Sequence, residues 1–320
     1  MTNVKCQMTN KNNLRIIFMG TPEFAVASLQ ALVEGGYNVV AVVTMPDKPA
    51  GRGHQLQYSD VKKFALSVGL PVLQPERLKD EAFIEQLRSY QADLQIVVAF
   101  RMLPEVVWSM PRLGTFNLHA SLLPQYRGAA PINWAIINGD KETGATTFML
   151  KHEIDTGNLI MQERLTIGED ENVGSVHDRL MMMGRDLVTR TVDMIADCDA
   201  RGVELPTTPQ PEQTELRPAP KIFKEDCEIH FDQMTATQVH NFVRGLSPYP
   251  AAWCNLTIKG QPFENVKIYS VEPIANSQKP MANDKSSILI PCREGSVAIL
   301  ELQAPGKKRM DIKSFLNGLH

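Results

Sequence analysis

The stretch LRIIFMGTPEFAVASLQALVEGGYNVVAVVT, residues 14–44, places a helical pattern between two apolar runs. The first run, Leu14–Met19, breaks at Gly20-Thr21-Pro22, and the pattern after it extends to Gly35-Gly36. The second run, Tyr37–Thr44, is dense in valine. Apolar strands that alternate with amphipathic helices are typical of a parallel sheet covered on both faces. The stretch therefore predicts the first strand–helix–strand unit of an α/β fold.

The same alternation continues along the chain. We expect strands at residues 72–73, 94–100, 115–119, 146–150 and 159–167, and helices at 60–68, 81–90, 132–137 and 172–198. In the last helix apolar residues recur near helical spacing, and Asn172 is placed to cap its first turn. The repeated order predicts a Rossmann-like, mostly parallel sheet.

The chain changes character after residue 203. Five prolines mixed with Thr, Gln and Glu exclude a helix or a central strand and predict a semi-extended linker; they are Pro206, Pro209, Pro211, Pro218 and Pro220. Short strands follow at 252–258, 266–271, 287–290 and 296–302, with one helix near 237–245. This pattern predicts a small OB-like β-barrel. The expected divisions are an N-terminal domain at 14–205, the linker at 206–218 and the barrel at 219–320.

Length and charge limit the possible classes of protein. A chain of 320 residues is comfortable for two domains. Its 22% charged and 43% hydrophobic residues are ordinary for a globular protein. The net charge of −3 does not indicate a nucleic-acid partner, but residues 219–320 carry +2 and the remainder −5. A basic C-terminal part permits contact with RNA.

Cysteine usage and hydropathy indicate the compartment. Five scattered cysteines form no C-x-x-C pair, which argues against a disulfide framework or a zinc site. The polar residues 1–13 lack the apolar core of a signal peptide. No apolar run approaches the ~20 residues that cross a bilayer. We therefore expect a cytoplasmic protein without a membrane or metal partner, and we expect a monomer.

The segment GTFNLHASLLP, residues 114–124, contains the strongest candidate site. Side chains alternate along a strand, so Asn117 and His119 share one face while Phe116 and Leu118 share the other. Two polar groups on one face of an apolar strand need partners, because an unpaired buried polar group costs several kcal/mol. For an isolated N-x-H, a hydrogen-bonded pair that steadies the following turn would be the better explanation.

Three motifs follow this strand in order. The strand is followed by SLLP at 121–124, then by RGAAP at 127–131 and by HEIDTG at 152–157. Asp155 alone would be explained as a turn cap before Thr156-Gly157. In this order, however, N-x-H-x-S-L-L-P, R-G-A-A-P and D-T-G resemble the tetrahydrofolate-dependent formyltransferases. The resemblance covers nearly the whole chain.

The resemblance implies transfer of a formyl group from 10-formyltetrahydrofolate to an amine, without a covalent intermediate on the protein and without a metal. Attack on the formyl carbon makes a tetrahedral oxyanion, for which the Asn117 amide and a protonated His119 are suitable donors. The amine must lose a proton and N10 of the folate must gain one. Asp155 can orient His119 and accept the proton directly or through water.

The resemblance also implies two folate-binding segments. Their residues are Ser121, Leu122, Leu123 and Pro124 in the first segment, and Phe100, Arg101, Met102 and Leu103 in the second. The second segment departs from the expected pattern, which has Tyr-Gly where this chain has Phe100-Arg101. Here it looks more like the sister family that acts on glycinamide ribonucleotide.

The acceptor amine is indicated by the insertion PDKPAGRGH at 46–54, which is longer than a usual connection between elements. It resembles the branch of the family that formylates methionyl initiator tRNA, in which this arm enters the acceptor end of the tRNA. The resemblance implies contacts from Lys48 and, above all, Arg52. After Gly53 this branch has more lysines than His54-Gln55-Leu56-Gln57 supplies.

The C-terminal part resembles the same branch. The similar segments are APKI at 219–222, RGLSPYP at 244–250 and PGKKR at 305–309. Lys307, Lys308 and Arg309 are predicted to contact the tRNA backbone. A solvated turn explains three neighbouring cations equally well.

Other functions stay open. A formyltransferase acting on a nucleotide-sugar amine would share the catalytic strand, but the 46–54 arm and the 305–309 turn argue against it. A non-catalytic RNA-binding protein is opposed by the complete set of Asn117, His119 and Asp155. A Rossmann dehydrogenase would need a G-x-G-x-x-G turn in place of GTP at residues 20–22.

Overall fold

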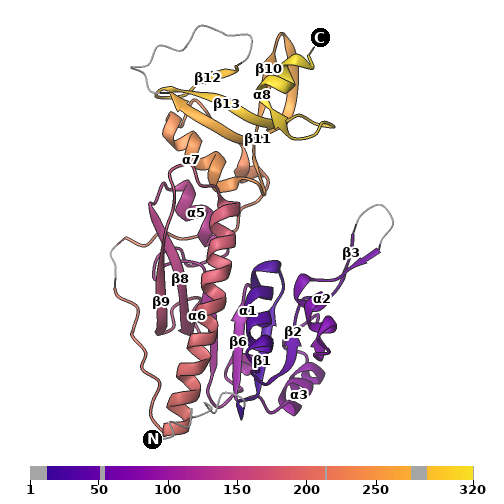
Figure 1. Ribbon diagram of the computed structural model, residues 1–320, viewed down its shortest axis with the longest axis vertical. Coiled ribbons are helices and arrows are strands. Elements are labelled where there is room, and N and C mark those ends of the chain that lie inside the picture. The colour runs from indigo at the N-terminus through magenta and orange to yellow at the C-terminus, as the bar shows by residue number, and fades with distance from the viewer. Residues whose placement is uncertain (1–12, 51–54, 213–214, 275–286, 320) are drawn as a thin grey trace, which may run out of the picture. The chain divides into compact units, whose positions relative to one another are not determined.

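The computed structural model describes residues 13–50, 55–212, 215–274 and 287–319 (Figure 1). The chain forms two compact units. The first comprises the chain up to Arg127 together with Gly144–Leu165 and Asp178–Leu216; the second comprises Gly128–Thr143, Thr166–His177 and the chain from Arg217 onward. The second unit thus includes segments that precede the predicted linker. The domain boundaries drawn from the sequence stay a prediction.

The first unit is built on a seven-stranded sheet with the order β5-β2-β1-β6-β7-β8-β9. Its strands are β1 (Ile16–Gly20), β2 (Val39–Val43), β5 (Val72–Leu73), β6 (Leu94–Val98), β7 (Thr115–His119), β8 (Glu142–Met149) and β9 (Leu159–Thr166). From β5 to β7 neighbouring strands run parallel, and β8 is antiparallel to β7. The Rossmann-like α/β fold expected from the sequence is confirmed.

The order of the strands reverses at β1. The chain passes from β1 to β2 and β5 on one side, and β6 then pairs with the other side of β1. Open parallel sheets bind ligands beyond the carboxyl ends of their strands at such a point. A Cβ on Gly20, the last residue of β1, would lie 3.0 Å from the Val98 carbonyl oxygen of β6. Glycine therefore lets the two strand ends approach each other there.

Helices cover this sheet, and they are α1 (Glu23–Glu34), α2 (Asp60–Ser67), α3 (Glu81–Ser89), α4 (Glu105–Trp108) and α6 (Val173–Arg201). As predicted, Asn172 caps α6, because its Oδ1 accepts a hydrogen bond from Ser175 N at 3.0 Å. A Cβ on Gly184 of α6 would lie 2.6 Å from Leu118 Cδ2, so Leu118 faces this helix. Asn117 and His119 therefore project from the opposite face of β7.

The second unit contains a curled antiparallel sheet of five strands. They are β10 (Ala252–Ile258), β11 (Gln261–Ile274), β12 (Leu289–Pro291), β13 (Ser296–Gln303) and β14 (Met310–Asp311). The other elements are α5 (Pro131–Ile137), the 3₁₀ turn η2 (Glu225–Cys227), α7 (Ala236–Leu246) and α8 (Ile312–Asn317). Val239, Val243 and Leu246 of α7 pack into the core formed with the strands. The small OB-like barrel is confirmed.

Segment 46–57 contains two short strands that the sequence did not indicate. Strands β3 (Lys48–Ala50) and β4 (Gln55–Gln57) pair only with each other, and the pair extends away from the sheet beside α2 (Figure 1). The sequence did not predict these strands because Pro49 and the neighbouring glycines are typical of loops. Proline lacks the backbone N–H that a central strand donates to its neighbour. Arg52 lies outside the described residues.

Two predicted strands are longer in the structure. Strand β8 begins at Glu142 instead of residue 146, and β11 covers 261–274 instead of 266–271. In β11 the extra residues are mostly polar or interrupted by proline, and pairing with β10 and β13 extends the strand beyond its apolar pattern. Among the described helices none is both long and apolar enough to cross a membrane.

Helices α5 and α7 meet at a glycine, which allows a stability prediction. A Cβ on Gly245 would lie 2.6 Å from Ile137 Cγ1 and 3.0 Å from the Ile137 backbone nitrogen. Gly245→Ala should therefore lower the free energy of unfolding by about 1–3 kcal/mol, because the backbone at Ile137 would have to move to relieve the clash. Gly318→Ala is the matched control, since its nearest atom would be 3.5 Å away. Urea unfolding with equal midpoints for both variants would contradict this packing.

Candidate active site

Strand β7 holds the two polar residues that the sequence indicated. Asn117 lies opposite Phe148 of β8 and is half-buried, whereas His119 lies opposite Thr146 and is only 6% exposed. The Asn117 carboxamide makes no hydrogen bond within the described part of the chain. It is therefore available to donate to a ligand.

The His119 ring is held by a backbone carbonyl. Its Nε2 lies 2.8 Å from the Tyr126 carbonyl oxygen. A carbonyl oxygen only accepts hydrogen bonds, so Nε2 carries a proton and donates it, and in the neutral ring Nδ1 is the acceptor. Sequence reasoning missed this partner, because Tyr126 contributes only its backbone. That backbone is in the left-handed region, with φ 59°.

Asp155 lies next to the other nitrogen of the ring. Its Oδ2 is 4.0 Å from His119 Nδ1, and its side chain is 13% exposed. The distance is too long for a direct hydrogen bond. A water or an amine can donate to both of these acceptors at once. The structure thus brings Asp155 and His119 together without a direct hydrogen bond between them.

The turn after β7 is fixed to its neighbouring strands. Thr146 Oγ1 of β8 donates to the Ser121 carbonyl at 2.6 Å and accepts from Leu123 N at 3.3 Å. Gln162 Nε2 of β9 donates to the Leu123 carbonyl at 3.1 Å. Ser121 and Leu123 are buried, while Leu122 is partly exposed. The predicted folate segment 121–124 is therefore held rigidly against β8 and β9.

The second predicted folate segment follows β6 at the point where the strand order reverses. The backbone amides and carbonyls of residues 100–103 make no hydrogen bond to other described residues, and Met102 is 74% exposed. Free backbone groups of this kind can pair with the edge of a heterocycle. The two predicted folate segments follow adjacent strands, since β6 pairs with β7.

Arg101 uses its guanidinium inside the protein. It donates to the carbonyls of Pro75 and Glu76, the latter at 2.9 Å, and it lies over the Phe100 ring. Burial lowers the pKa of this guanidinium from its usual value. The side chain that departs from the family pattern thus joins the loop after β5 to the segment after β6.

The base of the β3–β4 pair is anchored by a partly buried lysine. Lys62 Nζ of α2 lies 2.5 Å from Asp47 Oδ2 and 2.7 Å from Gln74 Oε1, and it also lies 3.9 Å from the centre of the Tyr58 ring. The hydrogen bond from Lys62 holds the pKa of Asp47 below its usual value. Both ends of the arm are therefore fastened, and the exposed Lys48 lies beyond that fastening.

The three cations after β13 are not equivalent. Arg309 forms two hydrogen bonds with the Glu301 carboxylate, at 2.6 and 2.5 Å, and its guanidinium lies over the Tyr269 ring. The bonds to Glu301 raise the pKa of Arg309. Lys307 and Lys308 are exposed, and no ion pair within the described residues involves them. They are the available charges of this turn.

A cleft of about 550 Å³ in the second unit adds cations that the sequence had indicated only in part. Among its lining residues are Lys221, Lys224, Lys267, Phe223, Tyr249 and Trp253, and no acidic residue lines it within the described chain. Tyr249 is 82% exposed and Phe223 is 56% exposed. Exposed aromatic rings among lysines suit stacked bases and phosphates.

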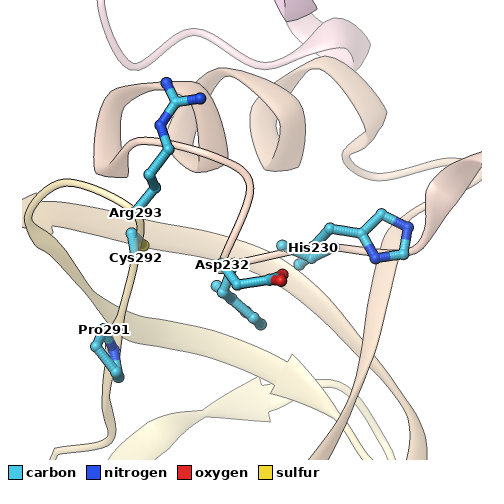
Figure 2. A pocket seen from close by; sticks show the side chains of 7 residues that line it. His230, Asp232, Pro291, Cys292 and Arg293 are labelled. Carbon is cyan, nitrogen blue, oxygen red and sulfur yellow. The ribbon is translucent and has the colours of Figure 1, made fainter.

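Figure 2 shows another hollow of the second unit, lined by residues 229–232 and 291–293. The Arg293 side chain points away from His230 and Asp232 (Figure 2). No hydrogen bond or ion pair within the described chain joins these three side chains. Burial raises the pKa of the Cys292 thiol, which keeps it neutral near pH 7. This hollow lacks converging catalytic groups.

The arrangement around His119 suits chemistry at a carbonyl carbon. It combines an unpartnered amide and an imidazole on strand β7 with a carboxylate on the loop after β8. Such a set can stabilise an oxyanion and move a proton. Within the described residues no cluster of three or more His, Cys, Asp or Glu side chains is arranged to hold a metal.

Comparisons with known proteins agree with this chemistry. A family model described as formyl transferase matches residues 14–192, and one described as formyl transferase, C-terminal domain, matches residues 221–320. The methionyl-tRNA formyltransferase of Bacteroides fragilis is 58% identical over 318 residues, which cover 97% of this chain and 96% of that protein.

Two solved structures share the fold at low identity. WlaRD, a sugar 3N-formyl transferase crystallised in the presence of dTDP and 5-N-formyl-THF, is 17% identical with a TM-score of 0.64, over 92% of this chain and 99% of that one. HypX from Aquifex aeolicus in complex with tetrahydrofolic acid is 17% identical with a TM-score of 0.61, over 95% of this chain. The present chain spans 47% of HypX, about half its length.

The geometry predicts which nitrogen of His119 is protonated. In the neutral ring the proton should be on Nε2, because this nitrogen donates to the Tyr126 carbonyl. Nitrogen-15 NMR of the histidine-labelled protein at neutral and mildly alkaline pH would show a proton coupled to Nε2. Asp155→Asn should shift the Nδ1 signal while the Nε2 proton stays. A proton on Nδ1 of the neutral ring would contradict the arrangement.

Proposed function

The chain belongs to the formyl transferase family, and from that premise we propose that it transfers the formyl group of 10-formyltetrahydrofolate to the α-amino group of methionyl initiator tRNA before translation initiation. The observation that carries the chemistry is the approach of His119 and Asp155 beside the unpartnered Asn117 amide. The choice of acceptor is supported by the 58% identity, over nearly the full length, to a protein named for that reaction.

In the proposed reaction the substrate amine attacks the formyl carbon, and the oxygen gains negative charge. Asn117 donates to this oxygen. His119 can donate only through Nδ1, because its Nε2 proton is bound to the Tyr126 carbonyl, and Nδ1 carries a proton only in the charged ring. Asp155 attracts that charge and accepts the proton that the amine loses, directly or through water. One proton returns to N10 of the folate as it leaves.

For the folate we propose the two segments that follow the adjacent strands β6 and β7. Ser121–Pro124 is held rigidly by Thr146 and Gln162, and Phe100–Leu103 offers free backbone groups. Arg101 contributes through its backbone and by holding its segment to the loop after β5, since its guanidinium already donates to two carbonyls. The folate supplies the activated formyl group.

For the tRNA we propose contacts from both units. Lys48 and Arg52 belong to the 46–54 arm, whose base is anchored through Lys62. In the second unit we propose Lys307, Lys308 and Arg309, and the two lysines are the stronger candidates because Arg309 is paired with Glu301. The lysine and aromatic cleft beside Tyr249 is a further surface for RNA.

We also propose that the protein is a monomer. We propose that it acts in the cytoplasm, where it meets its substrate, charged initiator tRNA. The catalytic domain would be 14–205, the linker 206–218 and the tRNA-contacting domain 219–320. A formyltransferase acting on a nucleotide-sugar amine is the alternative, and the likeness to WlaRD at 17% identity supports only a shared fold.

A direct assay tests the proposed acceptor. Purified protein with 10-formyltetrahydrofolate should formylate methionyl initiator tRNA and leave elongator methionyl-tRNA largely unformylated. Formyl transfer is followed by acid-gel separation of the charged tRNAs, with a dTDP-linked amino sugar offered in a parallel reaction. Equal activity on both tRNAs, or activity on the amino sugar alone, would contradict the assignment.

The role of Asn117 is tested separately. Asn117→Ala should lower kcat by about 10²–10³, because one oxyanion donor is lost. Asn117→Asp, which keeps the shape and removes the donor, should be at least as impaired. Both variants should unfold at the temperature of the wild type, since the amide has no partner among the described residues. Full turnover by Asn117→Ala would exclude the oxyanion role.

A further inference from the structure

Asp155 reaches His119 from an unexpected direction. Strand β8 runs antiparallel to β7, with Met149 opposite Phe116 and Thr146 opposite His119. The loop after β8 therefore starts near the amino end of β7, and it must return along the sheet to bring Asp155 to His119. A Cβ on Gly157 would lie 1.5 Å from the Met149 carbonyl oxygen, so the end of the loop lies directly against the last residue of β8.

Asp155 lies in a loop without regular structure, because residues 150–158 belong to neither β8 nor β9. Its φ is 53°, in the left-handed region that aspartate adopts more readily than most residues other than glycine. The loop is not fixed by pairing in the sheet, so contacts from outside it are well placed to set where the Asp155 carboxylate lies.

Gln210 supplies such contacts. Its Nε2 donates to the Asp155 carbonyl at 2.7 Å and to the Gly157 carbonyl at 2.9 Å. Its Oε1 accepts from Arg127 Nη2 at 2.6 Å. The orientation of the amide is settled by these partners, because a flipped amide would place oxygen against two carbonyls and nitrogen against a cation. Gln210 therefore clamps the loop on both sides of Thr156.

Arg127 connects this clamp to the histidine. The residue before it, Tyr126, holds His119 through its carbonyl. Two consecutive residues thus hold both catalytic partners, one directly and the other through Gln210. Gln210 itself lies between the two segments that match the family models, at 14–192 and 221–320. A residue of the predicted linker is consequently part of the frame of the active site.

We propose that Gln210 is a positioning residue for the proposed formyl transfer: by bonding the carbonyls of Asp155 and Gly157, it sets the distance between the Asp155 carboxylate and His119. The inference rests on the proposed function for its kinetic consequence. The distance between the Asp155 carboxylate and His119 depends only on this chain. Gln210 touches neither substrate in the proposed reaction, so its loss should slow turnover without weakening substrate binding.

The kinetic test compares Gln210→Ala with Thr208→Ala. Thr208 lies in the same linker and bonds Leu159 through its backbone alone, so its side chain is a matched control. Gln210→Ala should lower kcat by about 10–100-fold, since a displacement near 1 Å in a catalytic group can cost about 10²-fold. Both KM values should stay within about twofold, and Thr208→Ala should match the wild type. Wild-type kcat in Gln210→Ala would overturn the proposal.

Gln210→Glu separates donation from size. The glutamate can still pair with Arg127 but cannot donate to the two carbonyls, so kcat should fall at least as far as in Gln210→Ala. Wild-type turnover in Gln210→Glu would overturn the proposal. Equal rises in both KM values with a lowered melting temperature would also overturn it, because they indicate a general structural role.

A measurement without substrate separates this inference from the proposed function. The nitrogen-15 signal of His119 Nδ1 reports the nearby Asp155 charge. In Gln210→Ala it should move toward its position in Asp155→Asn, and in Thr208→Ala it should not. An unchanged signal in Gln210→Ala would overturn the positioning role even if the enzyme formylates tRNA. A shifted signal would support that role even if the acceptor proved to be another amine.

Discussion

The hydrogen bond from His119 Nε2 to the Tyr126 carbonyl constrains the rest of the site. It leaves Nδ1 as the one ring nitrogen that can act on a ligand or exchange a proton. Asp155 lies at that nitrogen, 4.0 Å away, and Asn117 projects from the same face of β7. The chemistry open to the imidazole is thus decided by a backbone carbonyl in the turn that follows its own strand.

The sheet explains why that turn can be rigid. Parallel strands from β5 to β7 end at one edge, where the segments after β6 and β7 meet the point of strand reversal. The antiparallel strand β8 then adds Thr146, which bonds the turn at Ser121 and Leu123. The same antiparallel direction sends the Asp155 loop back over the sheet. One change of strand direction therefore provides both a support for the turn and the loop that carries Asp155.

The sequence predicted the parts of this structure that depend on apolar periodicity or on local motifs. The strands at 94–100 and 115–119, the cap at Asn172 and the barrel all follow from such patterns. The roles of the Tyr126 carbonyl and the Gln210 amide could not be predicted. Every residue has a backbone carbonyl, so residue type does not show which one is used. A glutamine among prolines is typical of a linker. The strands β3 and β4 were not predicted either, since they are short and pair only with each other among the described strands.

The identity of a basic residue likewise does not show whether its charge is free to bind a ligand. Arg101 and Arg309 both stand in segments predicted to bind a ligand, yet each guanidinium already has partners within the chain. Lys307 and Lys308 keep their charge exposed, as does Lys48 beyond the anchored base of its arm. An exposed, unpaired cation attracts phosphate far more than one that must first break an internal pair. Recognition of a polyanion by a chain with a net charge of −3 therefore depends on where free lysines are placed, and the count of basic residues does not reveal it.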